Sequence, residues 1–374
     1  MVPYLDAVTD AFLEEVRRKK PSVLILSGDI SQNGEKVNHQ ELQKKLKRVQ
    51  EAGVPVLVIP GNHDINHPTP SSFFADERAA VEGPDPEDFY EIYHEFGYDQ
   101  AVSRDEDSLS YLYQLDEHYW LLMLDSCIYE PVHETGGRIR ESTLQWMREQ
   151  LEAAKEAGAL VIPVAHHNLL RESTLYPEEC TLKNSKEVIK LLEEYRLPLY
   201  ISGHLHLQRV KKNVNSPLQE GTYGIHEIVS SCLVIAPCQY GVLRFAEDGS
   251  LSYHTEKVDV QDFAERIQEE DPNLADFGQY SRKLLVDTIQ NQALAGLTSV
   301  SEEKRQEMAE LYADLNSAYC SGIPIQTREI KNGQAYAYWK QYRGRNEWFD
   351  RLSAILDDTK RDQNSLRLKA GIDF

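Results

Sequence analysis

Histidine, asparagine and aspartate side chains gather at a few points of the sequence, each soon after a short apolar run. The clearest example is the stretch 54–64, which reads VPVLVIPGNHD and ends in Asn62, His63 and Asp64. An apolar run of this length, closed by Pro-Gly, is typical of a strand that is buried on both faces of a sheet. Polar groups of this kind are costly to bury unless they bind something, so we interpret them as functional. The letters GNHD alone would be a weak signal.

Three further apolar runs end in side chains of the same chemistry. They are residues 23–26, followed by Asp29; residues 160–164, followed by His166 and His167; and residues 199–202, followed by His204 and His206. The runs alternate with predicted helices, an order typical of parallel crossover units. Because the carboxyl ends of neighbouring parallel strands meet at one edge of a sheet, we expect these side chains to face one crevice.

This set of side chains predicts a divalent metal site that acts on phosphate. Carboxylate, amide and imidazole groups suit Mn, Zn, Fe or a similar ion, and no thiolate is offered that would favour a soft metal. A carboxylate such as Asp29 can bridge two ions about 3.5–4 Å apart, the spacing at which a pair of ions clamps a phosphoryl group and turns a shared water into hydroxide. The residues therefore favour two-metal hydrolysis.

Hydrophobic periodicity predicts an α/β fold around these runs. Helices are expected at residues 3–20, 35–52, 86–96, 143–158 and 186–195. Further strands are expected at residues 110–115, 119–124, 208–212, 222–230, 240–245 and 251–257. The later strands suit a second sheet packed on the first. The long acidic, Pro-rich excursion at residues 65–107 suits a lid or binding loop beside the crevice.

The chain changes character near Val258, and we expect two domains, residues 1–258 and residues 259–374. The second part loses the strand runs and shows helical blocks, one of them behind a Ser299-x-x-Glu302 capping box. Six of its aromatic residues look at first like a nucleic-acid stacking set: Tyr336, Tyr338, Trp339, Tyr342, Trp348 and Phe349. Packing of a helical layer on the catalytic domain is the favoured interpretation, because the chain is acidic.

Composition excludes several classes of partner. The formal net charge of −21 over 374 residues argues against a general nucleic-acid or acidic-membrane surface, since such partners would be repelled. The five cysteines are scattered and suit a reduced, structural role. No apolar stretch approaches the length of a membrane span, and Met1 leads into an amphipathic helix rather than a signal peptide, which favours the cytoplasm for the chain as given.

The motifs Gly-Asp, Gly-Asn-His-Asp, a later histidine and Gly-His-x-His, in this order at strand ends, resemble the calcineurin-like metallophosphoesterase family over roughly residues 21–257. The resemblance implies two mixed β-sheets packed as a sandwich and flanked by helices, with a helical appendage at the C-terminus. It implies that Asp29 bridges two metals, that Asn62, His166 and His204 complete the second metal, and that His206 binds the first.

The resemblance also assigns the catalytic acid. His63 would protonate the leaving alkoxide or steady the transition state, with Asp64 orienting it through a hydrogen bond. His166 is preferred to His167 as the ligand, because the ligand of the family follows its strand directly and adjacent side chains point in opposite directions from an extended backbone.

One motif of the family is absent, the Asp-x-His at the end of the first strand. No Asp-x-His precedes Asp29, and Asp125, which ends a predicted strand, lacks a histidine two positions on and is interpreted as a structural residue. The first metal then keeps only Asp29 and His206. Either the natural start lies upstream, which we favour, or the site holds a single ion and is impaired. An upstream segment could also carry a secretion signal, so an extracellular or cell-envelope location stays open.

Loops near the crevice carry further groups that could hold the phosphate of a substrate. They are His67, His133, Arg138, Arg140 and Arg209. Loop position alone is a weak argument for any one of them. The sequence therefore predicts a hydrolase of phosphate esters, a phosphomonoesterase or phosphodiesterase that uses metal-bound hydroxide on a small-molecule or protein substrate. The alternatives are an impaired metal-binding protein that serves recognition and, less favoured, a structural module of the cell envelope.

Overall fold

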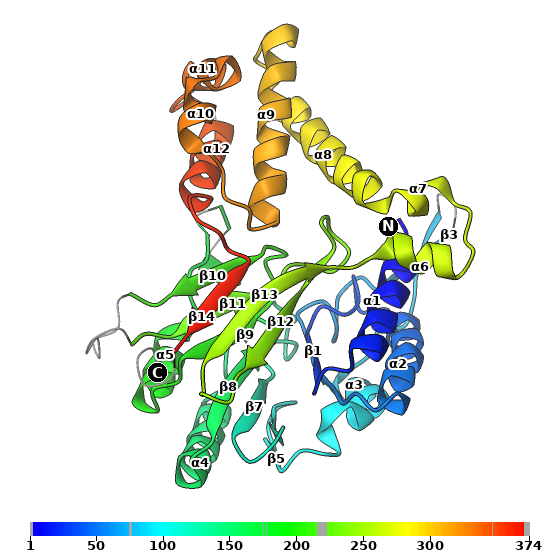
Figure 1. The fold of residues 1–374 in the computed structure, drawn as a ribbon, viewed down its shortest axis with the longest axis vertical. Coiled ribbons are helices and arrows are strands. Elements are labelled where there is room, and N and C mark those ends of the chain that lie inside the picture. Colours follow the sequence, from blue (N-terminus) through cyan, green and yellow to red (C-terminus); the bar gives the residue numbers. More distant parts are fainter. Residues whose placement is uncertain are drawn as a thin grey trace.

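A seven-stranded mixed sheet forms the centre of the molecule (Figure 1). This computed structural model describes residues 3–74, 77–173, 175–176, 178–214, 223–345 and 347–369. In sheet order the strands are β10 (Arg209–Lys212), β11 (His226–Val229), β9 (Leu199–Ser202), β8 (Leu160–Ala165), β7 (Tyr119–Leu124), β6 (Tyr111–Gln114) and β5 (Ser103–Arg104). Strands β7, β8 and β9 run parallel, so their carboxyl ends share one edge of the sheet.

A second layer packs against one face of this sheet. It contains the parallel pair β1 (Leu24–Ser27) and β2 (Val56–Ile59), and the antiparallel strands β12 (Gln239–Phe245), β13 (Leu251–Lys257) and β14 (Ser365–Leu368). Side chains of both layers form one buried cluster, in which Val58 and Ile59 of β2 lie with Met123 of β7 and Val164 of β8. The predicted sandwich of two sheets is confirmed.

Helices cover the outer face of the β1–β2 pair and the far face of the seven-stranded sheet. α1 (Leu5–Lys19) and α2 (Lys36–Glu51) pack on β1 and β2, where Val16 and Leu46 join the cluster between the sheets. α4 (Glu141–Ala157) and α5 (Ser185–Glu194) pack on the far face of the seven-stranded sheet and form a second cluster there. These helices fall close to the residues that periodicity predicts, because each carries one apolar stripe.

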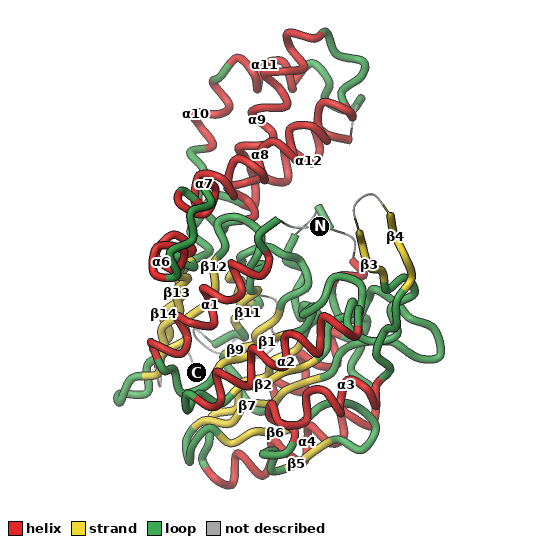
Figure 2. Tube along the Cα trace, turned by 90° about the vertical axis from the view of Figure 1, so that its right-hand side faces the viewer, coloured by secondary structure: helices red, strands yellow, loops and turns green. Residues whose placement is uncertain are grey.

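The excursion at residues 65–107 holds more structure than the sequence predicts. A hairpin of β3 (Ser71–Phe74) and β4 (Glu77–Ala80) precedes α3 (Pro86–Tyr93), and a π-helical turn follows α3 (His94–Tyr98). The hairpin stands out from the body of the molecule in Figure 2. Asp85 caps α3 with a reciprocal capping box, which explains why this helix begins where it does.

The C-terminal region is a group of helices that rises from the sheets in Figures 1 and 2. Its members are α6 (Val260–Arg266), α7 (Pro272–Ala275), α8 (Phe277–Gly296), α9 (Glu302–Cys320), α10 (Thr327–Asn332), α11 (Gln334–Lys340) and α12 (Glu347–Asp358). Trp339 and Phe349 are buried in a hydrophobic cluster of these helices, so these two aromatic residues pack rather than stack on nucleic acid. After α12 the chain returns as β14, which pairs with β13. No helix among the described residues is long and apolar enough to cross a membrane.

Candidate metal centre

Two parallel strand pairs deliver the predicted ligands to one place. Asp29 follows β1, Asn62 follows β2, His166 follows β8 and His204 follows β9. The backbone turns sharply at Gly28, whose φ is +89°, and a Cβ added there would lie 2.6 Å from the Gly61 nitrogen. Only glycine permits so close an approach, so the Gly-Asp and Gly-Asn motifs bring the two strand ends together.

Four ligand atoms from these strand ends converge. The Asn62 Oδ1 atom lies 3.0 Å from His166 Nε2 and 2.9 Å from His204 Nδ1. The two imidazole nitrogens are 3.2 Å apart, and Asp29 Oδ2 lies 3.3 Å from His166 Nε2. Because these separations are those of atoms that share one ion at about 2.0–2.2 Å, the four groups suit a single divalent cation.

The hydrogen bond on the other side of the His166 ring determines which ring nitrogen is available to a cation. His166 Nδ1 lies 2.9 Å from the Ser27 carbonyl oxygen and donates to it, which leaves Nε2 as the nitrogen with the lone pair. That lone pair faces the acceptor oxygens of Asn62 and Asp29. A cluster of acceptors is stable only with a positive charge among them, either an additional proton on His166 or a metal ion. The site therefore fits a cation by its chemistry as well as by its distances.

Charge interactions within the cluster agree with this description. Burial would raise the pKa of Asp29, but the neighbouring His166 outweighs it and the pKa lies well below the ordinary value, so Asp29 is an anion. Burial lowers the pKa of His204 to about 2, helped by the neighbouring His166, so its imidazole is neutral. An anionic carboxylate and a neutral imidazole are the forms that bind a divalent ion.

His167 lies beside the cluster with both ring nitrogens engaged elsewhere. His166, His167 and His204 have ligand atoms within 4.8 Å of one another. The His167 Nδ1 atom lies 2.9 Å from Ser126 Oγ, however, and Nε2 lies 3.0 Å from the Thr135 carbonyl oxygen. The His166 ring has one nitrogen directed at the other ligands and the His167 ring has none free, which favours His166 as the ligand.

The other side of Asp29 carries fewer ligand atoms. His206 Nε2 lies 3.9 Å from Asp29 Oδ2, and the His206 side chain is 48% exposed. Among the described residues only these two of the predicted ligands meet there. The structure thus brings all five predicted metal ligands into one region, with four of them in a tight group and His206 at its exposed edge.

Asp64 does not contact the His63 ring, contrary to the hydrogen bond that the resemblance implies. The buried Asp64 carboxylate accepts from the Gly61 nitrogen at 2.8 Å and from the Ser31 nitrogen at 2.9 Å. The His63 ring instead donates from Nδ1 to the Gln32 carbonyl oxygen, 2.5 Å away. The two side chains diverge because Asp64 points into the base of the loop while His63 lies half-buried above it. Asp64 therefore holds the two ligand loops, not the histidine.

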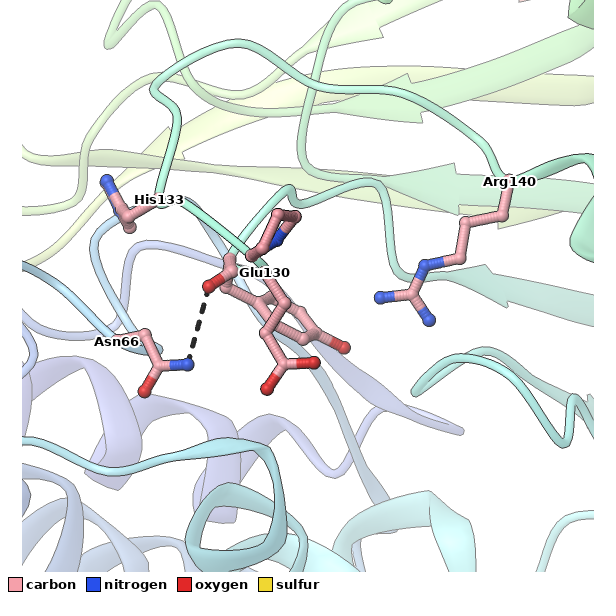
Figure 3. Close-up of a pocket in the computed structure, with 6 residues that line it drawn as sticks. Asn66, Glu130, His133 and Arg140 are labelled. Atoms are coloured by element: carbon pink, nitrogen blue, oxygen red, sulfur yellow. Dashed lines mark hydrogen bonds between the residues drawn. The ribbon is translucent and has the colours of Figure 1, made fainter.

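A surface hollow opens beside the ligand group, with a volume of about 770 Å³. Its lining includes Asn66, Tyr129, Glu130, His133 and Arg140, and Figure 3 shows Arg140 reaching toward it from the side opposite Asn66 and His133. The hollow adjoins the ligands because His133 Nε2 donates to the Asn62 carbonyl oxygen at 2.5 Å. His133 and Arg140 were among the predicted loop residues, whereas Tyr129 and Glu130 carry no motif that would reveal them.

Glu227 supports the candidate site, and the sequence analysis did not single it out. It lies inside β11, fully buried, and accepts hydrogen bonds from Ser202 Oγ at 2.6 Å, from the Leu169 nitrogen at 2.9 Å and from the Leu170 nitrogen at 2.6 Å. These contacts hold the loop after β8 to the end of β9, and so fix His166 relative to His204. A single glutamate in a strand gives no sequence signal for this role.

Comparisons with known proteins extend this description. Residues 4–208 match the family model described as calcineurin-like phosphoesterase, and residues 259–362 match the C-terminal domain of cyclic nucleotide phosphodiesterase. A Haemophilus influenzae protein named 3',5'-cyclic adenosine monophosphate phosphodiesterase CpdA is 24% identical over 272 residues, or 69% of this chain and 83% of its own. A Psychrobacter arcticus protein named probable cyclic nucleotide phosphodiesterase is 23% identical over 267 residues, or 68% of this chain and 82% of its own. A solved dimetal phosphatase from Danio rerio aligns with a TM-score of 0.48 at 14% identity, over 67% of this chain and 85% of its own.

Proposed function

Because the chain belongs to the calcineurin-like phosphoesterase family, whose model matches residues 4–208, we propose that it hydrolyses a 3',5'-cyclic nucleotide. The chain is a hydrolase of phosphate esters, and its family implies divalent metal ions. Two observations support the cyclic substrate: the match of residues 259–362 to the C-terminal domain of cyclic nucleotide phosphodiesterase, and the names of the relatives.

The observation that carries the proposal is the group of four ligand atoms at the strand ends. Asp29, Asn62, His166 and His204 would hold a divalent ion, and the Ser27 carbonyl keeps His166 in the tautomer that can bind it. When bound, the ion supplies Lewis-acid stabilisation of the phosphoryl oxygens and a water of lowered pKa. Metal identity within the Mn, Fe and Zn group is left open by this set of ligands.

Asp29 and His206 would form a second, weaker position for an ion. The half-exposed His206 side chain is free to turn toward Asp29, which lies 3.9 Å away. Two ligands bind less tightly than four, so we expect the chain to hold one ion firmly and a second only at a higher concentration of metal.

His63 would donate the proton to the departing alkoxide. Its Nδ1 atom is held by the Gln32 carbonyl, so Nε2 is the nitrogen that can exchange a proton. The His63 backbone nitrogen also donates to Asp29 Oδ1 at 3.0 Å, which places the proposed acid next to a proposed metal ligand. Asp64 would act as a positioning residue, because it secures the loops that carry both groups.

The hollow beside Asn62 would receive the organic part of the substrate. Arg140 lies with its guanidinium 5.4 Å from the centre of the Tyr129 ring, so this wall is cationic and partly aromatic. Such a wall suits the anionic and flat parts of a nucleotide. The long chain segment between β2 and α3 borders the hollow through Asn66, and we propose that this residue takes part in the binding role predicted for residues 65–107.

Steady-state hydrolysis tests the proposal. The wild-type protein, supplied with Mn²⁺, should cleave 3',5'-cyclic AMP and bis(p-nitrophenyl) phosphate, and Asp29→Ala and His63→Ala should each remove the activity. His118→Ala is a matched control, because that histidine is 70% exposed in the turn before β7. Equal turnover by the wild type and both site variants, or metal binding without turnover of any ester, would overturn the proposal.

A further inference from the structure

A second cavity lies at the seam between the phosphoesterase sheet and the C-terminal helices. Its volume is about 220 Å³. Its charged lining residues are Glu172, Arg209 and Lys211 from the sheet side, and Asp357, Asp358, Lys360 and Arg361 from the helical side. Its lining comes from both family matches: Glu172 lies in the match that ends at residue 208, and residues 357–361 lie in the match that ends at residue 362. The cavity shares no lining residue with the hollow beside the metal ligands.

Arg209 is the unusual residue of this cavity. The residue is only 2% exposed, yet its Nε, Nη1 and Nη2 atoms have no hydrogen-bond partner among the described residues. Its guanidinium lies 4.0 Å from the centre of the Tyr319 ring, which covers one face of the group and leaves the edges that carry its donors. A buried guanidinium with every donor unsatisfied is costly, and such groups are normally paired with an anion.

Three carboxyl groups line the cavity, those of Glu172, Asp357 and Asp358, but none of them lies within ion-pair distance of Arg209. Lys360 pairs with Asp357 at 2.8 Å, and Asp358 accepts from the Tyr319 hydroxyl at 3.4 Å. Among the described residues, Arg209 forms no ion pair. Burial and the nearby Glu227 also hold the pKa of Glu172 well above its ordinary value, so Glu172 is a neutral acid beside Arg209.

The remaining cations of the cavity strengthen the attraction for an anion. Lys211 donates through its ammonium to the Arg171 carbonyl oxygen, and Arg361 donates through Nη2 to the Val210 carbonyl oxygen at 3.2 Å. Both are bonded to neutral carbonyls, so their charges stay uncompensated by these contacts. The chain as a whole carries a formal charge of −21, whereas the lining of this cavity holds four cationic side chains and three carboxyl groups, of which Glu172 is neutral.

We propose that the cavity around Arg209 binds a small oxyanion, the phosphate or carboxylate group of a small molecule, at the seam between the two parts of the chain. The planar fork of Arg209 matches two oxygens of either group, and the Tyr319 ring holds the fork in place. A volume of about 220 Å³ equals that of about seven waters, which admits a compact ligand and excludes a nucleotide.

The site lies at a junction that joins the C-terminal helices to the strand after the Gly-His-x-His motif. Gln208 donates through Nε2 to the Gln363 carbonyl oxygen at 3.0 Å, and the Val210 nitrogen donates to Gln363 Oε1 at 2.9 Å. An anion on Arg209 would therefore fasten β10 to the segment that links α12 to β14. Bound ligand should stabilise the folded chain, because only the folded chain assembles this cavity.

Binding to the metal-free full chain tests the proposal, because removal of metal takes away the main attraction for phosphate at the candidate catalytic centre. Orthophosphate and malonate serve as the phosphate and carboxylate probes, measured by isothermal titration calorimetry and by the shift in thermal midpoint. Arg209→Met should weaken the better probe by about tenfold or more, and Arg209→Lys, which keeps the charge and loses the fork, should weaken it less. Arg244→Met is the matched control, since this arginine lies on an exposed position of β12.

Each outcome decides the question. Saturable binding of one equivalent to the wild type and to Arg244→Met, lost in Arg209→Met, supports the site, and the preferred probe identifies phosphate or carboxylate. Without ligand, Arg209→Met should have a thermal midpoint at or above that of the wild type, because an unpaired buried charge is removed. Binding that is equal in the wild type and Arg209→Met, or no binding of either probe to the wild type, would overturn the proposal.

Discussion

The two sides of Asp29 differ in how firmly the fold holds the candidate ligands. On one side Asn62 and His166 are 4% and 1% exposed, and His166 is oriented by the Ser27 carbonyl. On the other side His206 is half-exposed and lies 3.9 Å from Asp29. Ligands at strand ends buried between two sheets are held in place before any ion binds. The half-exposed His206, two residues after His204, lacks such support from the fold.

The largest effect should come from removing a ligand on the buried side of Asp29. His204→Ala removes one of the four ligand atoms, so metal affinity should fall by more than the roughly 10–100-fold that loss of a supporting residue costs. His206→Ala removes an exposed ligand and should reduce the affinity for the ion of the buried group far less. Titration of the metal-free protein with Mn²⁺ by calorimetry measures both. Equal losses in the two variants would contradict the distinction between the two sides.

The next effect concerns chemistry rather than metal binding. His63→Ala should lower kcat by about 10²–10⁴-fold while metal affinity stays near that of the wild type, because the His63 ring bonds a backbone carbonyl, and the backbone bond of His63 to Asp29 survives the substitution. His67→Ala is a matched comparison, since its ring stacks on His63 with centres 5.2 Å apart. A loss of bound metal in His63→Ala would place this histidine among the ligands instead.

A smaller effect should follow when the support of the buried side is weakened. Glu227→Gln keeps the shape but replaces one acceptor oxygen by a donor that faces the loop after β8. Metal affinity should fall by about 10–100-fold and the free energy of unfolding by about 1–3 kcal/mol. Chemical denaturation and Mn²⁺ titration measure the two quantities. Unchanged metal affinity in a folded variant would show that the site does not depend on the hydrogen bonds from this loop to Glu227.

The smallest effect belongs to an exposed ion pair far from the ligands. Lys19 of α1 donates to Glu256 of β13 at 2.6 Å, and this bond lowers the pKa of Glu256 to about 2. Because the pKa of Glu256 is lowered in the folded chain, the pair stabilises that chain at pH values above 4.5, the ordinary pKa. This stabilisation is lost as the pH falls toward 2. Glu256→Gln should therefore cost under about 1 kcal/mol at pH 7, with no change in metal binding.

The pH dependence of that pair provides its check. The difference in unfolding free energy between the wild type and Glu256→Gln should shrink as the pH falls from 4.5 toward 2. Urea denaturation at several pH values measures it. A difference that grows in acid would contradict the sign derived from the lowered pKa.

The strand ends could be predicted from the sequence, because the apolar runs indicate buried strands and the Gly-Asp, Gly-Asn-His and Gly-His-x-His motifs after them supply the candidate ligands. It did not predict the direction of Asp64, since the choice between His63 and the Gly61 and Ser31 amides depends on how the loop closes. The places of Glu227 and Tyr129 at the site were not predicted either, because they arise from contacts between distant segments. The strand β14 was missed because its partner, β13, lies more than a hundred residues earlier.

Anomalous diffraction from crystals soaked in Mn²⁺ tests the central claim most directly. The account predicts a strong peak within about 2.0–2.3 Å of Asn62 Oδ1, His166 Nε2 and His204 Nδ1, with Asp29 as the fourth ligand. A second, weaker peak between Asp29 and His206 is expected only at high metal concentration. A strong peak elsewhere, or none near these atoms, would contradict the assignment of this site.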